Sequence, residues 1–220
     1  MASPGIGAAG RLLRTHLVRD WSYGGRVGVD WSHQLVEQLD WHWQTRLRPR
    51  LDGLTDEEYF WEPVRGCWSI RRRGQSAAPV AVGSGEFVFE FAYPAPDPAP
   101  VTTIAWRLAL IIVGSFAARN GSHFGGPALG DHESQCWRNF TYAGTAERAL
   151  EQLDEAYAVW IAGVRGLGVE GLARPCGPAE DPFGDEPMAQ LVLHINREVI
   201  HHGAEIALLR DLYRTRHELV

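Results

Sequence analysis

The sequence predicts an all-α protein, a four-helix bundle with a small β-hairpin inserted between its first two helices. Apolar residues recur at helical spacing over four long segments. Between the first two of these segments lies a stretch of about 30 residues, rich in proline, glycine and alternating phenylalanine, which is too short to bury a core of its own. Four long helices joined by loops bury their apolar faces against one another, so the bundle is the expected arrangement.

The first helix is expected from about Ser32 to Leu47, because apolar residues recur there at every fourth position. Asp30 or Ser32 can cap its start. The second, third and fourth helices are expected over about 103–120, 145–164 and 186–214. Residues 1–29 are expected to form a loosely ordered arm, and residues 30–220 the bundle domain.

Two shorter elements are expected between the first and second helices. Thr55 and Glu58 have capping-box spacing, in which the hydroxyl accepts from the Glu58 N–H and the carboxylate reaches back, so a short helix should run through Phe60. Within the excursion at about 67–100, residues 80–82 and 87–91 read as a β-hairpin. The proline-rich run 94–100 then reads as a stiff connector.

The composition excludes several classes of function. All 21 basic residues are arginine, so lysine Schiff bases and the P-loop lysine are absent. A net charge of −6 argues against nucleic acid as a partner. Three widely spaced cysteines indicate a reducing cytoplasm, and the most apolar run, Leu108–Ala118, is about half the length that crosses a bilayer. We expect a soluble cytoplasmic protein with a small-molecule substrate and no membrane partner.

One dense group of chemical side chains lies on the fourth helix. At about 100° per residue, five of them share an arc of roughly 100°. They are His194, Glu198, His201, His202 and Glu205. Glu198 and His202 are spaced i, i+4 and can converge on one ion, which suits zinc, nickel or iron(II) if another helix supplies a further ligand. The alternative is a solvated face with mild ion pairing.

Several motifs of the chain resemble those of a known family. They lie at residues 39–43, 47–63, 66–69, 102–108 and 197–203. In these stretches the chain resembles the DinB-like superfamily of bacterial four-helix bundles, which includes bacillithiol S-transferase-type and mycothiol-dependent maleylpyruvate isomerase proteins. The resemblance implies a metal held by a histidine of the second helix and a His/Glu-x-x-x-His pair of the last. In this chain that pair is Glu198 and His202.

The chain departs from this pattern at the second-helix position, where Leu110 stands and the family has histidine. A leucine donates nothing to a metal, so water or another histidine would have to complete the set. The candidates are His194, His42 and His123.

The resemblance implies a metal-dependent transferase of a low-molecular-weight thiol such as mycothiol, with a divalent metal and the thiol as cofactors. His194 and Glu205 would be the catalytic residues that orient ligands or move protons, and Trp106 and Arg107 would contact the thiol. Trp41, Trp43, Trp61 and Trp68 could wall a pocket together with Trp106. The alternative is a metal-free bundle acting in ligand binding, stress response or dimer scaffolding. Bundles of this kind often pair, and a homodimer is the oligomer we expect.

Overall fold

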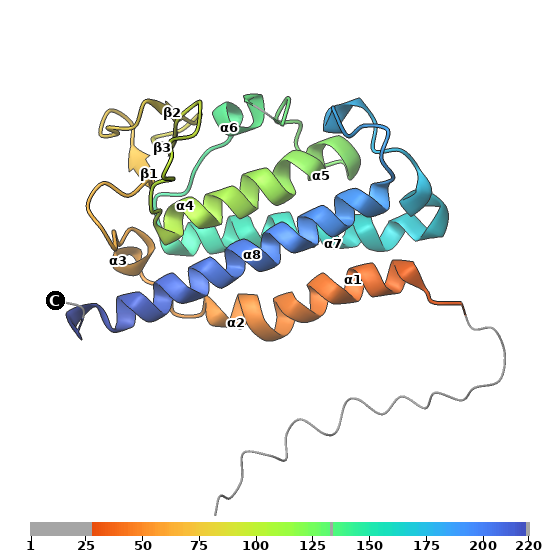
Figure 1. The fold of residues 1–220 in the computed structure, drawn as a ribbon, viewed down its shortest axis with the longest axis horizontal. Helices are drawn as coiled ribbons and strands as arrows, with labels where there is room; N and C mark the ends of the chain where they lie inside the picture. The colour runs from red at the N-terminus through yellow and green to blue at the C-terminus, as the bar shows by residue number, and fades with distance from the viewer. Residues whose placement is uncertain (1–27, 133, 219–220) are drawn as a thin grey trace, which may run out of the picture.

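A computed structural model of the chain describes residues 28–132 and 134–218. Almost all of the arm expected over residues 1–29 lies outside the described residues. The described part is predominantly helical and carries a small three-stranded sheet at one end (Figure 1). It contains no helix long and apolar enough to cross a membrane.

Some helical elements follow one another without a break. The π-helical elements, which close i→i+5 turns, are labelled η1 and η2. The α- and π-helical elements are α1 (Trp31–His42), η1 (Trp43–Leu47), α2 (Arg48–Arg50), α3 (Asp56–Tyr59), α4 (Ile104–Ala109), η2 (Leu110–Ala117), α5 (Ala118–His123), α6 (Gln135–Asn139), α7 (Ala146–Ala173) and α8 (Met188–Arg214). Two short 3-10 helices are η3 (Pro178–Glu180) and η4 (Arg216–Glu218). The strands are β1 (Ile70–Arg72), β2 (Val80–Val82) and β3 (Phe87–Phe91). Thus α1, η1 and α2 form one run, and α4, η2 and α5 another.

The first run begins where the sequence predicts. The Asp30 carboxylate accepts a hydrogen bond from the His33 N–H at 3.0 Å, which caps α1. Leu39, Trp43 and Leu47 are buried, as the four-residue repeat requires. The wide turn of η1 was not expected, because apolar spacing does not distinguish one inserted residue from a regular helix.

The short helix α3 shows half of the expected capping box. The Thr55 hydroxyl accepts from the Glu58 N–H at 3.2 Å. The prediction that the Glu58 carboxylate reaches back to the Thr55 backbone was wrong, because this side chain is buried against the guanidinium of Arg210 on α8. A carboxylate removed from water gains more from a paired cation than from one backbone N–H.

The excursion between the first two long helical runs contains one strand more than predicted. The expected hairpin is present as β2 and β3, with Val82 opposite Phe89. On its other side β3 pairs antiparallel with β1, where Ile70 also lies opposite Phe89. The sheet order is therefore β1-β3-β2, which places Phe89 at the centre and buries it against the helices.

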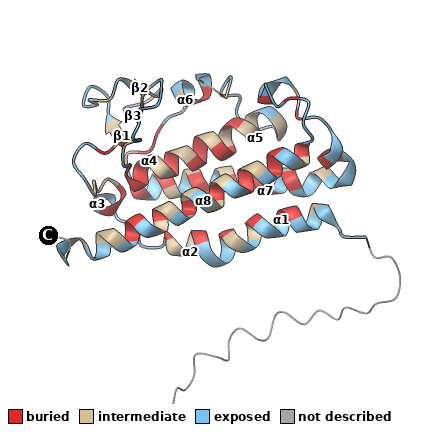
Figure 2. Ribbon diagram, in the orientation of Figure 1, coloured by how far each residue is buried: buried red, intermediate tan, exposed pale blue. Residues whose placement is uncertain are grey.

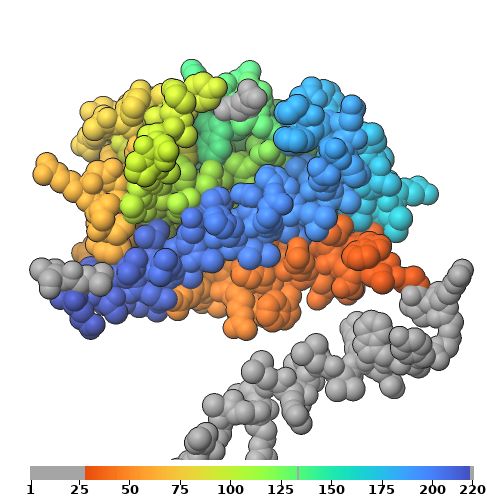
Figure 3. All heavy atoms as spheres, in the orientation of Figure 1, coloured from red at the N-terminus to blue at the C-terminus, as the bar shows by residue number. Residues whose placement is uncertain are grey.

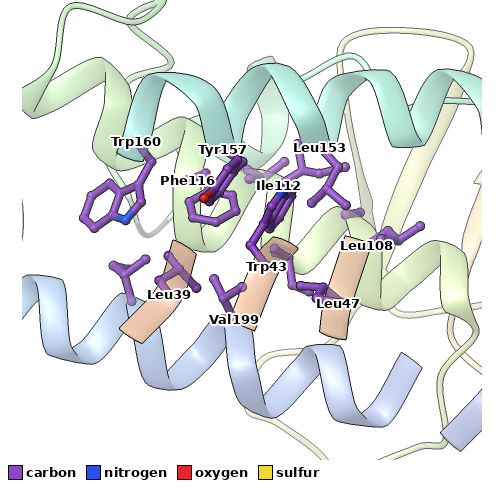
Figure 4. Packing of buried hydrophobic residues seen from close by; sticks show 14 of the residues in the cluster. Leu39, Trp43, Leu47, Leu108, Ile112, Phe116, Leu153, Tyr157, Trp160 and Val199 are labelled. Atoms are coloured by element: carbon purple, nitrogen blue, oxygen red, sulfur yellow. The ribbon is translucent and has the colours of Figure 1, made fainter. Parts of the chain in front are cut away.

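The core lies between the long helical elements (Figure 2). At its middle the Trp43 ring stacks on Tyr157 of α7, with centroids 3.7 Å apart, and meets the edge of Phe116 of η2 at 6.3 Å (Figure 4). Leu39 and Val199 are also fully buried in this cluster. These contacts tie α1, η1, η2, α7 and α8 together.

The last two long helices differ from prediction only at their ends. The expected third helix stops near 164, whereas α7 continues to Ala173 across a break at Gly168, whose φ of 61° favours glycine. The segment Pro175–Pro187, here called the strap, returns the chain to α8. α8 begins at Met188 directly after Pro187, which is its N-cap residue and has an extended backbone conformation.

Candidate functional site

Five of the six predicted site residues, namely Glu198, His202, Glu205, Arg107 and His194, are linked to one another along α8 and α4. α8 packs closely on the first helical run at Gly203, where an added Cβ would lie 2.9 Å from Leu47 Cδ1. The neighbouring His202 is turned inward and its side chain is 13% exposed, whereas that of His201 is 62% exposed. The two histidines therefore have different environments although they are adjacent in sequence.

His202 is held between two carboxylates of its own helix. Its Nδ1 lies 2.6 Å from Glu205 Oε2, and its Nε2 lies 3.6 Å from Glu198 Oε2. A carboxylate at Nδ1 accepts the ring N–H there and fixes the tautomer, which leaves the Nε2 lone pair on the side of Glu198. Glu198 Oε2 and His202 Nε2 are thus close enough to bind the same cation.

Arg107 of α4 joins this group from the neighbouring helix. Its Nη1 lies 3.0 Å from Glu205 Oε2 and 3.4 Å from His202 Nδ1. Burial lowers the pKa of Arg107, and the charge of Glu205 opposes that shift. The guanidinium compensates the carboxylate that orients His202, and it lies on the Nδ1 side of the ring.

His194 lies one helical turn before Glu198, on the other side of that carboxylate. Its Nδ1 is 3.7 Å from Glu198 Oε1 and only 2.7 Å from Arg197 Nη2. Burial is the main cause that lowers the pKa of His194, and the positive charge of Arg197 adds to it against the opposing charge of Glu198. Because the arginine donates to Nδ1, the proton of the neutral ring is on Nε2, and His194 acts as a hydrogen-bond donor in this arrangement.

A cation could meet His202 from either side of its ring. Ligand atoms of His201, His202 and Glu205 lie within 4.8 Å of one another. That arrangement competes with the hydrogen bond between His202 and Glu205 and lies beside the Arg107 guanidinium, which repels a cation. On the Nε2 side no hydrogen bond of His202 has to be broken. Glu198 has a guanidinium beside it there, with Arg197 Nε 3.4 Å from Oε1, but the oxygen that lies 3.6 Å from His202 Nε2 is Oε2. The residues therefore suit a divalent ion bound by Glu198 and His202, with two donors from the protein.

Leu110 stands where the resemblance drawn from the sequence implies a histidine ligand. It is half-buried at the start of η2, and its Cδ1 lies 3.5 Å from where a Cβ on Gly114 would be. Its side chain offers no donor atom. Of the other candidates for a third ligand, His42 lies on α1 and His123 binds Glu180 instead, with 2.9 Å between Nε2 and Oε1.

The five tryptophans that were expected to wall one pocket lie in different places, so that prediction was wrong. Trp43 is in the core and Trp41 is exposed on α1. Trp61 packs edge-on against Tyr213. Trp106 and Trp68 are neighbours with centroids 6.3 Å apart. The Trp106 indole N–H donates to the Glu90 carbonyl at 2.7 Å, and its ring lies 5.1 Å from the Arg107 guanidinium carbon, so it supports that side chain.

A second polar cluster was missed by the sequence analysis. Glu180 of the strap is buried, and its carboxylate meets His123 Nε2 at 2.9 Å and Arg119 Nη2 at 3.3 Å. His132 Nδ1 lies 3.3 Å from the same carboxylate. These residues are separated by up to about 60 positions and share no spacing motif, so only the fold brings them together.

Arg107 and Arg119 stand twelve residues apart on one helical run, yet both reach partners on or beside α8. In a regular α-helix they would point about 120° apart. The π-helical turns of η2 between them change the phase of the helix.

Comparison with known proteins identifies one family. Residues 38–206 match the DinB superfamily, a range that includes η1, the sheet, η2 and the whole Glu198–Glu205 strip. No curated protein and no solved structure matches the chain.

Proposed function

Because the chain belongs to the DinB superfamily, we propose that it is a four-helix-bundle protein that binds a divalent metal and transfers a low-molecular-weight thiol of the mycothiol kind to an electrophilic small molecule. The observation that carries this proposal is the placement of His202. Its Nδ1 is held by Glu205 at 2.6 Å, and its Nε2 lies 3.6 Å from Glu198. An imidazole oriented by a carboxylate is the usual setting of a metal-binding histidine.

Glu198 and His202 would hold the metal, which is zinc, nickel or iron(II) by its donor set. When bound, such a metal lowers the pKa of a thiol and so supplies the thiolate nucleophile. With Leu110 in place of a third ligand, the protein provides fewer donors than its family pattern and leaves more room for ligands from solution.

The other residues orient and stabilise this pair. Glu205 fixes the His202 tautomer, and Arg107 offsets the charge of Glu205 in a partly buried position. His194 donates through Nε2, because Arg197 occupies its Nδ1, and can hold an acceptor oxygen of a ligand. His194 and Glu205 therefore serve as positioning residues in this proposal, and the proton of the thiol passes to solvent.

The test is metal analysis of protein purified without an affinity tag, followed by zinc titration. Glu198→Ala and His202→Ala should each abolish binding, and His201→Ala is the matched control, because His201 is adjacent but exposed. The rate at which thiol disappears from a mixture of mycothiol and an electrophile should fall in Glu198→Ala and His202→Ala and stay unchanged in His201→Ala. Stoichiometric zinc that persists in Glu198→Ala would overturn the proposed metal pair.

A second function is favoured by one specific contact. The Arg107–Glu205 ion pair compensates the partly buried carboxylate beside His202 without any metal ion. The corresponding proposal is a metal-free bundle that acts in ligand binding or as a dimer scaffold. It predicts that neither zinc nor a chelator changes the Tm, whereas a bound metal raises the Tm with concentration. Sedimentation of the same samples tests the homodimer.

A further inference from the structure

A cavity of about 660 Å³ lies between the strap and the first turns of α8. In the space-filling view the strap and the N-terminal part of α8 meet on the visible face (Figure 3). The volume is in the range that holds small organic ligands. It adjoins the Glu198–His202 pair, because His194 and Arg197 line the cavity and both contact Glu198.

The strap forms a fixed wall of this cavity. Its two ends are joined by backbone hydrogen bonds from Cys176 N to Glu186 O and from Gly177 N to Gly184 O, each 2.8 Å long. Its tip is anchored by the buried Glu180 carboxylate, which meets His123 and Arg119. The cavity is therefore preformed, and a ligand need not order the loop to bind.

The two walls carry opposite charges. The α8 wall presents His194 and the exposed Arg197, whereas the strap wall presents the exposed carboxylates of Asp181 and Glu186. Within residues 28–132 and 134–218, no ion pair joins Arg197 to either strap carboxylate, and the polar side-chain contacts of Arg197 are with His194 and Glu198 of its own helix. Two facing charges without a direct bridge suit a molecule that carries both signs.

Apolar side chains line the same space. Phe183 on the strap is 64% exposed and Leu193 on α8 is 49% exposed, and Leu191 also contributes to the lining. Exposed phenylalanine and leucine at a cavity are typical of a surface that a ligand covers. The ligand therefore combines two opposite charges with an apolar body.

We propose that this cavity binds a zwitterionic, amino-acid-like small molecule. Its carboxylate meets Arg197, its ammonium group meets Asp181 and Glu186, and its apolar side chain packs on Phe183 and Leu193. The residues that would hold this molecule do not include Glu198 or His202, although Arg197 also contacts Glu198. Binding can therefore be tested in the absence of a metal.

The experiment is calorimetric titration of the full-length protein in buffer containing a chelator, with L-phenylalanine as the probe. N-acetyl-L-phenylalanine lacks the ammonium group and L-phenylalaninamide lacks the carboxylate. We expect L-phenylalanine to bind at least about tenfold more tightly than either. Arg197→Gln and Glu186→Gln should each weaken it about tenfold. Arg214→Gln and Glu147→Gln, at exposed positions outside the cavity lining, should bind as the unchanged protein does.

Equal binding of the three compounds would show an apolar hollow without charge recognition and would overturn the proposal. So would the absence of saturable binding of L-phenylalanine up to about 10 mM. Because Arg197 and Glu186 are exposed, both variants should keep the Tm of the unchanged protein, which separates loss of binding from loss of folding.

Discussion

Arg210 of α8 and Glu58 of α3 form a bidentate ion pair in which both side chains are almost fully buried. The Nε–Oε1 and Nη2–Oε2 distances are 2.7 and 2.9 Å. The remaining nitrogen, Nη1, donates to the carbonyls of Arg50 and Asp52, so every guanidinium nitrogen has a partner. Arg210 thus fixes α3 and the turn after α2 to the C-terminal half of α8, the helix that carries the candidate site.

Removing one partner of this pair should be strongly destabilising. Arg210→Met leaves the Glu58 carboxylate buried without a cation, and we expect a loss of about 3–5 kcal/mol in the free energy of unfolding. The double variant Arg210→Met/Glu58→Leu should recover a large part of this loss. Urea unfolding of the two variants measures the difference, and equal stability of both would contradict the buried-charge explanation.

Replacing Glu205 tests how His202 is oriented. Glu205→Gln removes the negative charge of the group that accepts the hydrogen bond from the His202 Nδ1–H, and zinc affinity should fall about 10–100-fold, as for other outer-sphere carboxylates. Isothermal titration with zinc measures the change. Asp211→Asn, on the same helix but outside the site, is the control and should leave the affinity unchanged. An unchanged affinity in Glu205→Gln would mean that this contact does not support a metal ligand.

Leu110→His should add a third donor to the site. We expect zinc or nickel affinity to rise, because a third protein ligand reduces the number of positions that solvent must fill. Competition against a chromogenic chelator gives the ratio of affinities, and Leu110→Gln controls for the loss of the apolar side chain. No gain with histidine would show that position 110 does not face Glu198 and His202.

Glu180 should make stability depend on pH. Burial alone would raise the pKa of this carboxyl, but hydrogen bonding from His123 and His132 and the charge of Arg119 hold it well below its ordinary value of 4.5. A group with a lowered folded-state pKa contributes stability above its unfolded pKa, and that contribution disappears as the pH falls through the folded-state value. Glu180→Gln should therefore lower the Tm at pH 7, and the difference from the unchanged protein should shrink below about pH 4.

Thermal unfolding of both proteins between pH 7 and pH 3 measures this effect. The exposed Glu147→Gln is the control and should follow the unchanged protein at each pH. A difference that stays constant over the whole range would assign the loss to packing instead of charge.

The helical segments were predictable because their apolar residues repeat at helical spacing, as Leu39, Trp43 and Leu47 do. Strand β1 was not, since Ile70–Arg72 is short and its pairing with β3 is decided by the fold. For the site, the i, i+4 spacing of Glu198 and His202 indicates a shared direction. The spacing of residues within α8 cannot predict that Arg107, which lies on α4, contacts Glu205.

The cluster around Glu180 shows more clearly what the sequence alone cannot predict. His123 and Glu180 lie far apart along the chain, and neither belongs to a motif. Their contact depends on where the strap returns to α8, a property of loop geometry that side-chain periodicity does not encode. The cavity beside the strap was unpredictable for the same reason.

The eight π-helical residues of η2 have a consequence for how this chain can evolve. Loops usually tolerate gain or loss of a residue, whereas a helix interior does not. Deleting one residue between Arg107 and Arg119 would rotate one end of the run by about 100° relative to the other. One guanidinium would then leave its carboxylate partner while the other kept its own. Substitutions can therefore accumulate along this stretch. An insertion or deletion there would break either the contact of Arg107 with Glu205 or the contact of Arg119 with Glu180.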